Sequence, residues 1–440
     1  MPYGYQVPSV YEELQKALPN TIILQEDGCG ISPRDYRLIP AKWLPGGVRL
    51  DYYETSDFTA EPVGSDRFQE IRFNWGLAKP HPSLNFHGYG VVMTGTLQPD
   101  ASFNGMLLVP CQDSVRLYID GRLLLDGWSD HRQDHAGVDF SFHAGESHAF
   151  RIEYTCDHSG RNVTFAYSNH DEHGIDRAVT LAEQSDLVIL VCGDDTVTSG
   201  EGMDRSSLRL YGPQKELIRR IGALKKPTVL VLEVGKPVDL TEEEPDMNAI
   251  LLPWFGGEMG ARAIVEALLG LFNPAGRLPI SFPKNVGCLP CYYTQLPGGS
   301  PAWLEDSKES RYPFGFGLSY TDFTLDTLTV EVTGSCTAEA RFIARNTGDT
   351  DGVCVPQLYV EDPVSTVVTP DKRLCAFDRV ALKAGESREC CFSLDERAFR
   401  LLNAQHCWVV EPGRFILHLG LNSRDMSQQV EIQLKGNTYV

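Results

Sequence analysis

The sequence has 440 residues, of which 42% are hydrophobic and 22% charged, so it is long enough for two to four globular domains with sizeable cores. Lys and Arg number 39 and Asp and Glu number 59, which gives a formal net charge of −20. Because such a field repels phosphate backbones, nucleic acid is excluded as an expected partner. No apolar run approaches the roughly 18 residues of a membrane-spanning helix, so a membrane is not expected either.

The N-terminus and the cysteines leave the cellular compartment open. No basic stretch followed by an apolar one is visible at the start, so no signal peptide is predicted; secretion stays open if an N-terminal segment is missing. The 12 cysteines are scattered, and several, such as Cys192, lie in apolar runs. This pattern favours buried free thiols over a disulfide framework and slightly favours the cytoplasm. Cys288 and Cys291 have redox-motif spacing, but a structural role is preferred.

Residues 1–41 begin an α/β pattern. Ser9 and Glu12 form a capping-box pattern that predicts a short amphipathic helix ending near Leu18. The apolar run at 21–24 then predicts a buried strand.

Residues 42–172 change to short alternating strands separated by Gly, Asp and Asn turns. The predicted strands are 48–53, 90–97, 114–119, 150–154 and 162–167. Asp120 and Gly121 form a strong hairpin signal between two of them. This block is predicted to be an all-β module.

Residues 173–290 return to alternating helices and strands. The predicted helices are 178–184, 214–224 and 259–271, and the predicted buried strands are 187–192, 228–234 and 249–252. Continuous apolar strands between helices indicate a parallel sheet covered on both faces. Since 1–41 supplies a further helix and strand, the β module is most simply an insertion into this domain.

The last part of the chain is again β. Residues 291–320 form a connector rich in Pro, Gly and Tyr, and 321–437 contain predicted strands such as 340–344 and 355–360. The spacing of these strands predicts a seven-strand sandwich.

Ionisable side chains gather where the strand 187–192 ends. Ligands of open parallel sheets bind at the carboxyl ends of the strands. Asp194 and Asp195 lie at that end, and glycines flank Glu201 in the loop that follows, so the loop can present this carboxylate outward. Asp204 and Arg205 could anchor the loop by a charge-assisted hydrogen bond. Composition alone favours a solvated acidic loop with helix caps over a functional site.

Several motifs in one order resemble family 3 glycoside hydrolases of the β-glucosidase type. The loop SGEGMDR at 199–205, followed by PQKELI at 213–218, resembles the acid/base segment of that family. Further matches are PWFGGEMG at 253–260, NPAGRLP at 273–279, YPFGFGLSY at 312–320, and NTG at 346–348 with EPG at 411–413 in a fibronectin-III-like tail. The inserted block resembles a PA14 domain through LDYY at 50–53, RLYIDG at 116–121, DGW at 126–128 and RIEY at 151–154.

This resemblance implies a multidomain α/β plus all-β architecture. Residues 1–41 and 173–290 would form a split, flavodoxin-like α/β sandwich with a parallel sheet. Residues 42–172 would form a PA14-like β domain, 291–320 a connector, and 321–437 a fibronectin type III-like domain. The family's TIM barrel, which needs about 250 residues, has no counterpart here.

The resemblance also implies a mechanism. The implied reaction is hydrolysis of terminal non-reducing β-D-glucosyl residues by a retaining enzyme, which uses two carboxyl groups. Glu201 would be the acid/base, and Asp204 and Arg205 would position its loop. The nucleophile would lie on the missing barrel, so none is expected on this chain. We therefore expect either a truncated product that lacks its N-terminal half or a subunit of a separate barrel-bearing chain, nearly inactive alone. Asp194 is a weak candidate for sugar contact. Asp194 or Asp195 is conceivable as a substitute nucleophile, but the sugar-binding pocket would still be missing.

Other interpretations stay open at this point. The chain could be a non-catalytic carbohydrate-binding or regulatory protein derived from such a glycosidase. Trp128 is a weak candidate for stacking on a sugar, although a core or hairpin aromatic residue is the more common role. The pair of adjacent aspartates that holds calcium in PA14 lectins is replaced by Cys111-Gln112-Asp113, which disfavours a calcium lectin. His131 and His135 have helical metal-ligand spacing in a β-rich region, so no metal or other cofactor is expected.

Overall fold

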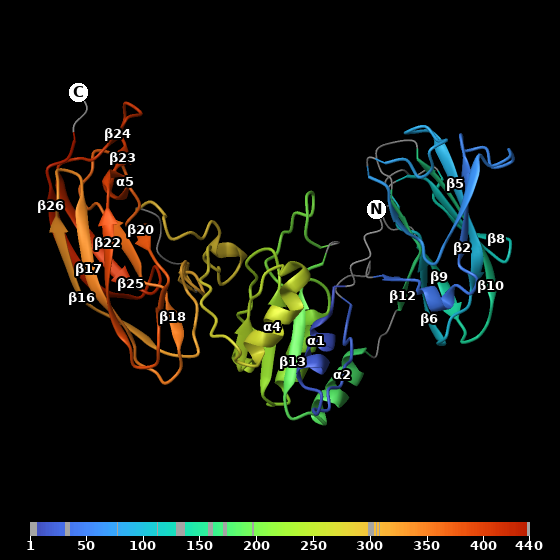
Figure 1. The fold of residues 1–440 in the computed structure, drawn as a ribbon, viewed down its shortest axis with the longest axis horizontal. Coiled ribbons are helices and arrows are strands. Elements are labelled where there is room, and N and C mark those ends of the chain that lie inside the picture. Colours follow the sequence, from blue (N-terminus) through green and yellow to red (C-terminus); the bar gives the residue numbers. More distant parts are fainter. Residues whose placement is uncertain are drawn as a thin grey trace. The chain divides into compact units, whose positions relative to one another are not determined.

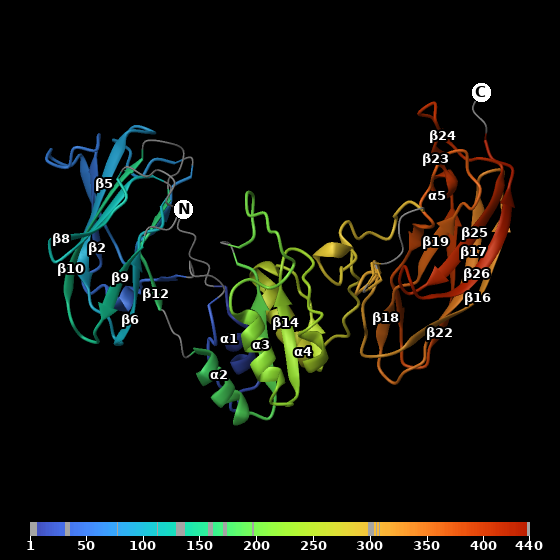
Figure 2. The ribbon, with the colours of Figure 1, turned by 180° about the vertical axis from the view of Figure 1, so that it is seen from behind.

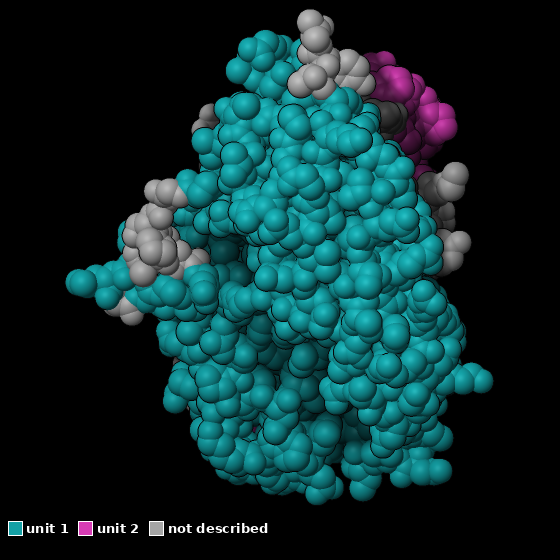
Figure 3. Space-filling view, turned by 90° about the vertical axis from the view of Figure 1, so that its left-hand side faces the viewer, with its two compact units in different colours: residues 1–25, 181–440 teal, residues 26–180 magenta. Residues whose placement is uncertain are grey.

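The computed structural model divides the chain into two compact units. Unit 1 contains residues 1–25 and 181–440, and unit 2 contains residues 26–180; Figure 3 colours them separately. The structure describes residues 7–30, 36–76, 78–111, 113–128, 137–156, 162–169, 174–195, 198–297, 303–304, 306–307 and 309–437. The predicted metal-ligand candidates His131 and His135 lie outside these residues.

Unit 2 consists of antiparallel β-sheets. Its six-stranded sheet has the order β3 (Gly64–Phe68), β2 (Val48–Tyr53), β5 (Tyr89–Leu97), β10 (His148–Cys156), β7 (Val115–Ile119), β8 (Arg122–Asp126). Its four-stranded sheet has the order β1 (Arg37–Leu38), β12 (Ala166–Asn169), β6 (Phe103–Leu108), β9 (Gly137–Phe142), and β11 (Asn162–Thr164) pairs with β4 (Arg72–Asn74). Alternate side chains of these strands enter one shared core, as the alternating sequence pattern predicts. The prediction of one strand at 162–167 was wrong, because it is split into β11 and β12.

The hairpin between β7 and β8 is confirmed. Asp120 and Gly121 have φ values of 50° and 76°, the left-handed conformation that a two-residue hairpin turn requires at both positions. The Asp120 carboxylate accepts a 2.8 Å hydrogen bond from the Ala149 backbone amide of β10. The turn therefore fixes the register of two adjacent strand pairs.

Replacing Gly121 by alanine should lower the free energy of unfolding by about 1 kcal/mol, because a side chain in the left-handed region costs roughly that much. No heavy atom stands within 4 Å of the added Cβ, so the backbone conformation is the only cost. Urea unfolding measures the change, and Arg122→Ala on the same hairpin is the control. An unchanged midpoint for Gly121→Ala would contradict the assigned turn.

The α/β part of unit 1 contains a parallel sheet in the order β13 (Val188–Gly193), β14 (Thr228–Glu233), β15 (Ala249–Leu251). Its helices are α1 (Val10–Ala17), α3 (Gln214–Gly222) and α4 (Gly260–Leu268), and α2 (Gly174–Glu183) crosses the boundary between the units. Front and back views show α4 and α3 on opposite faces of the sheet (Figures 1 and 2). The predicted alternation of apolar strands and helices is thus confirmed for this part of the chain.

The first helix begins as predicted, but the strand after it does not form. The Ser9 hydroxyl accepts from the Glu12 amide while the Glu12 carboxylate accepts from the Ser9 amide, so the capping box is present. The prediction of a buried strand at 21–24 was wrong: these residues join no sheet, and Ile22 and Leu24 are 87% and 49% exposed. An apolar segment becomes a buried strand only where a neighbouring strand accepts its backbone hydrogen bonds.

The C-terminal part of unit 1 is a β-sandwich. One sheet has the order β16 (Phe323–Val332), β17 (Ala338–Asn346), β22 (Ser387–Leu394). The other has the order β20 (Arg373–Phe377), β19 (Gln357–Glu361), β25 (Gly413–Gly420), β26 (Met426–Leu434), and the short pairs are β18 (Gly352–Cys354) with β21 (Val380–Leu382) and β23 (Leu401–Leu402) with β24 (Trp408–Val409). The two main sheets therefore hold seven strands, as predicted, and enclose a separate core with the short helix α5 (Glu396–Phe399).

None of the 12 cysteines, all of which lie in the described ranges, forms a disulfide, and the buried ones are Cys111, Cys156, Cys192, Cys288, Cys336 and Cys354. Buried free thiols were the expectation from the sequence. In the described ranges, no helix has both the length and the apolar character that crossing a membrane requires.

Candidate active site

The loop that follows β13 presents the Glu201 carboxylate to solvent. The Asp195 carboxylate accepts hydrogen bonds of 2.8 and 2.9 Å from the backbone amide and hydroxyl of Thr198, which starts the loop as a tight turn. A second turn, with a 3.1 Å bond from the Met203 amide to the Gly200 carbonyl, places Glu201 at its tip. The Glu201 side chain is exposed, which leaves its carboxylate open to a reacting group.

A buried carboxylate anchors this loop to the strand ends. The Asp194 side chain is fully buried and binds two cations, Arg205 from the loop at 3.1 Å and Lys236 from the segment after β14. The Arg205 guanidinium also donates to the backbone carbonyl of Arg209 and lies 5.3 Å from the ring of Tyr211. Arg205 therefore connects the far end of the loop to the root of β13.

The surroundings of Asp194 and Asp204 differ from those predicted from the sequence. Asp194 is enclosed by its two ion pairs and faces no open solvent. Asp204, in contrast, is exposed, and the Arg205 guanidinium binds Asp194 rather than Asp204. Loop anchoring thus rests on Asp194 and Arg205 in this structure.

The first residue of α3 fixes the end of β13. The Gln214 side-chain oxygen accepts from the Gly193 amide at 2.7 Å, and its side-chain nitrogen donates to the Gly193 carbonyl at 2.9 Å. The same nitrogen donates to the Tyr211 carbonyl at 2.9 Å. The buried amide thereby satisfies both backbone groups of Gly193, as a neighbouring strand would.

Glu233 ends β14 opposite Gly193 and is half-buried. Burial raises the pKa of its carboxyl above the ordinary value, because removal from water disfavours the charged form. A second acidic group therefore lies at this edge of the sheet, one whose environment favours the protonated state.

Glu233→Gln should stabilise the chain at neutral pH relative to the parent. A folded-state pKa above the unfolded one means that the native state binds more protons, so Glu233 costs stability as pH rises through its pKa values. The difference in free energy of unfolding between variant and parent should grow from pH 4 to pH 7. Glu331→Gln, which changes an exposed carboxylate of β16, is the control. If the difference in free energy of unfolding between variant and parent shrinks as pH rises, burial does not raise the pKa of Glu233.

Trp128 belongs to unit 2 and is half-buried. The Arg116 guanidinium lies 4.4 Å from the centre of its ring, and Phe58 makes an edge contact at 5.9 Å. Its backbone amide donates to Asp126 at 3.2 Å, so the indole is held by the hairpin of β7 and β8. One face of the ring is thus already occupied by a cation.

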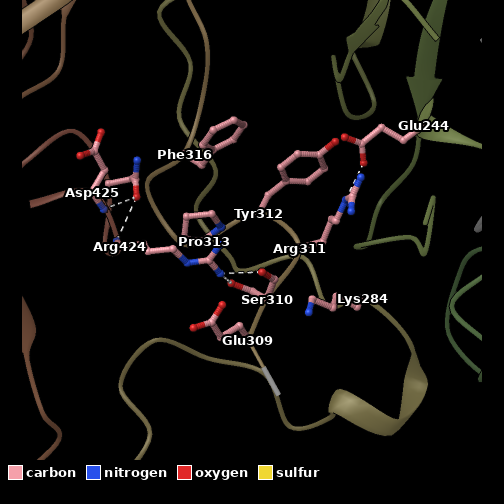
Figure 4. Close-up of a pocket in the computed structure, with 11 residues that line it drawn as sticks. Glu244, Lys284, Glu309, Ser310, Arg311, Tyr312, Pro313, Phe316, Arg424 and Asp425 are labelled. Carbon is pink, nitrogen blue, oxygen red and sulfur yellow. Dashed lines mark hydrogen bonds and ion pairs between the residues drawn. The ribbon is translucent and has the colours of Figure 1, made fainter. Parts of the chain in front are cut away.

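A separate cavity of about 540 Å³ lies where the connector meets the C-terminal sandwich (Figure 4). The basic side chains that line it have acceptors: Arg311 donates to Glu244 at 2.6 Å, and Arg424 donates to the Ser310 carbonyl at 2.6 Å. The Lys284 ammonium binds Asp306 at 2.8 Å. None of the residues named above around Glu201 lines this cavity.

Sequence reasoning missed three residues of this site: Lys236, Gln214 and Glu233. The carboxyl ends of parallel strands meet at one edge, so the residues that follow β14 were the place to search for partners of Asp194. Lys236 lies three positions after that strand. Gln214 makes the hydrogen bonds to Gly193 that a neighbouring strand would otherwise make. The apolar pattern of a strand in the sequence does not indicate such a side chain.

Comparison with known proteins identifies two family domains in the chain. The glycosyl hydrolase family 3 C-terminal domain matches residues 2–320, and the fibronectin type III-like domain matches residues 354–423. A periplasmic beta-glucosidase of Salmonella typhimurium is 36% identical over 270 residues, which are 58% of this chain and 35% of that protein. A beta-xylosidase of Formosa agariphila is 36% identical over 262 residues, 58% of this chain and 36% of that protein.

The fold is also found in solved structures. The beta-glucosidase of Kluyveromyces marxianus superposes with a TM-score of 0.81 at 23% identity, covering 98% of this chain and 56% of that one. The chain therefore spans about a third to just over half of the length of the proteins it matches. Because the family 3 domain match extends over most of its length, the chain belongs to glycosyl hydrolase family 3, with that family's α/β C-terminal domain and a fibronectin type III-like sandwich.

Proposed function

We propose that the chain is the C-terminal component of a retaining glycoside hydrolase that removes terminal non-reducing β-D-glucosyl residues. The observation that carries this proposal is the exposed Glu201 carboxylate, held at the tip of an anchored loop at the carboxyl end of a parallel strand. In its protonated form Glu201 donates a proton to the glycosidic oxygen as the bond breaks. The resulting carboxylate then accepts a proton from the water that attacks the anomeric carbon.

The nucleophile of this reaction belongs, in the proposal, to polypeptide outside this chain. A retaining enzyme needs a second carboxylate roughly 5–5.5 Å from the first. A TIM barrel takes about 250 residues, whereas the parallel sheet of the described residues has three strands. The matched relatives supply support, because 65% of the Salmonella protein and 44% of the Kluyveromyces protein lie outside the match (100 − 35 and 100 − 56).

We also propose that unit 2 is a PA14-like insertion. Unit 2 holds 155 residues (180 − 26 + 1), which are about 35% of the chain. The Salmonella and Formosa relatives match only 58% of the chain, while the Kluyveromyces structure covers 98%. An insertion that some relatives carry and others lack explains this difference. Trp128, which is half-buried, is the residue of unit 2 that we assign to sugar contact.

The test is hydrolysis of aryl β-glucosides by the purified chain, alone and mixed with a separately produced polypeptide that carries the barrel. We expect little activity alone and a large gain in the mixture. Aryl β-xylosides form the second arm, because a relative of equal identity is named a beta-xylosidase. Sugar binding without hydrolysis in the mixture would instead favour a regulatory protein. Full activity of the isolated chain would refute the proposal that its active site is incomplete.

A further inference from the structure

The parallel sheet of unit 1 has an open edge along β13. The Val188 amide donates to the Pro227 carbonyl and the Asp194 amide to the Glu233 carbonyl, both at 2.9 Å. Alternate residues of β13 therefore point their backbone groups toward β14, and Ile189 and Val191 point theirs away from it. Within the described ranges β13 pairs with β14 and with no second strand.

This open edge has a defined length. At its carboxyl end, the Gln214 amide already occupies both backbone groups of Gly193. What remains is the N–H and the C=O of each of Ile189 and Val191, which is the pattern that a short added strand would pair with. The Gln214 side chain thus closes the carboxyl end of this edge. The backbone groups at 189 and 191 leave room for about one short added strand.

One face of the same strand is also uncovered. Side chains alternate along a strand, so Leu187 and Val191 share a face, and they are 52% and 48% exposed. Leu190 and Cys192, on the other face, are buried. Parallel strands in α/β proteins are buried on both faces, so this strip of apolar side chains lacks its usual cover.

The unpaired segment 21–24 indicates which strand the sheet lacks within the described residues. In doubly wound sheets of the flavodoxin type, the strand after the first helix is separated from the third strand by the strand that precedes that helix. Helix α1 packs against α4, and the apolar Ile22 and Leu24 that follow it pair with no strand. A single parallel strand inserted beside β13 would give both that segment and the open edge a partner.

We propose that the open edge of β13 is the attachment site for the polypeptide that completes the enzyme, which adds one apolar β-strand in parallel and covers Leu187 and Val191. This inference rests on the proposed function. A second copy of the chain is the less suitable occupant. A two-fold axis would pair two β13 edges antiparallel, and two chains of charge −20 repel each other.

The experiment uses the full chain and, as probe, the part of the Salmonella typhimurium beta-glucosidase that lies outside the match. Ile189→Pro removes an N–H that β14 does not use and blocks an added strand, since proline is tolerated on strand edges. Val191→Lys places a charge on the uncovered face, and Val364→Lys, at an exposed valine of the sandwich, is the matched control. We measure binding by titration and amide hydrogen exchange at 189 and 191.

We expect the parent and Val364→Lys to bind equally, both β13 variants to bind at least tenfold more weakly, and exchange at 189 and 191 to slow at least tenfold in the complex. No binding by the parent, or equal binding by Ile189→Pro, overturns the attachment site. Self-association that Ile189→Pro abolishes, without probe binding, overturns it in favour of a second copy. A complex with protected β13 but no glucoside hydrolysis refutes the proposed function alone. Hydrolysis that is unaffected by Ile189→Pro refutes the attachment site alone.

Discussion

Glu201→Gln is expected to lower kcat of the reconstituted enzyme about 10²- to 10⁴-fold on alkyl β-glucosides, the range that general acid–base catalysis contributes. The amide has nearly the shape of the carboxyl group but cannot give a proton to the departing oxygen. With dinitrophenyl β-glucosides, whose leaving group needs no proton, the step that breaks the glycosidic bond should slow far less. Steady-state and burst kinetics with both substrate types measure this difference.

The control for this prediction is Glu331→Gln, which changes an exposed carboxylate of β16 and should leave kcat unchanged. Equal slowing on both substrate types would assign the acid role to another residue.

Asp194→Ala is expected to lower the free energy of unfolding by about 3 kcal/mol, because it leaves two cations without their buried partner. The side chains of Arg205 and Lys236 are 15% and 30% exposed, so partial hydration keeps the loss at the low end of the usual 3–5 kcal/mol for a broken buried pair. Urea unfolding, followed by hydrogen exchange of the β13 and β14 amides, measures this loss.

Asp371→Asn, at an exposed position, is the matched control and should change stability by less than about 0.5 kcal/mol. In the reconstituted enzyme Asp194→Ala should also lower kcat, since Arg205 loses the group that holds the far end of the Glu201 loop. A variant that keeps full stability would show that the two cations find water or other acceptors instead.

Elements with strong local signals were predictable from the sequence. The capping box at Ser9, the hairpin at Asp120 and Gly121, and the apolar strands β13 and β14 depend on neighbours in the chain, and all appear as predicted. The exposed position of Glu201 also followed from its flanking glycines.

Features that depend on a distant partner were not predictable in this way. The segment 21–24 has the apolar pattern of a strand, yet a strand requires a neighbour, and no strand pairs with it in the described part of the chain. The ion pairs of Asp194 join residues 11 and 42 positions away, distances at which sequence spacing carries no signal. Asp204 was therefore assigned a contact that Asp194 makes instead.

The Gln214 amide at Gly193 has a consequence for assembly. Because this side chain belongs to α3, the base of the Glu201 loop is tied to a helix of the same chain rather than to whatever later joins the sheet. The turn and the ion pairs that shape the loop are likewise internal to this chain. A polypeptide that joins the sheet would thus find the Glu201 loop already formed. It would need only to position the sugar and the opposing carboxylate relative to Glu201.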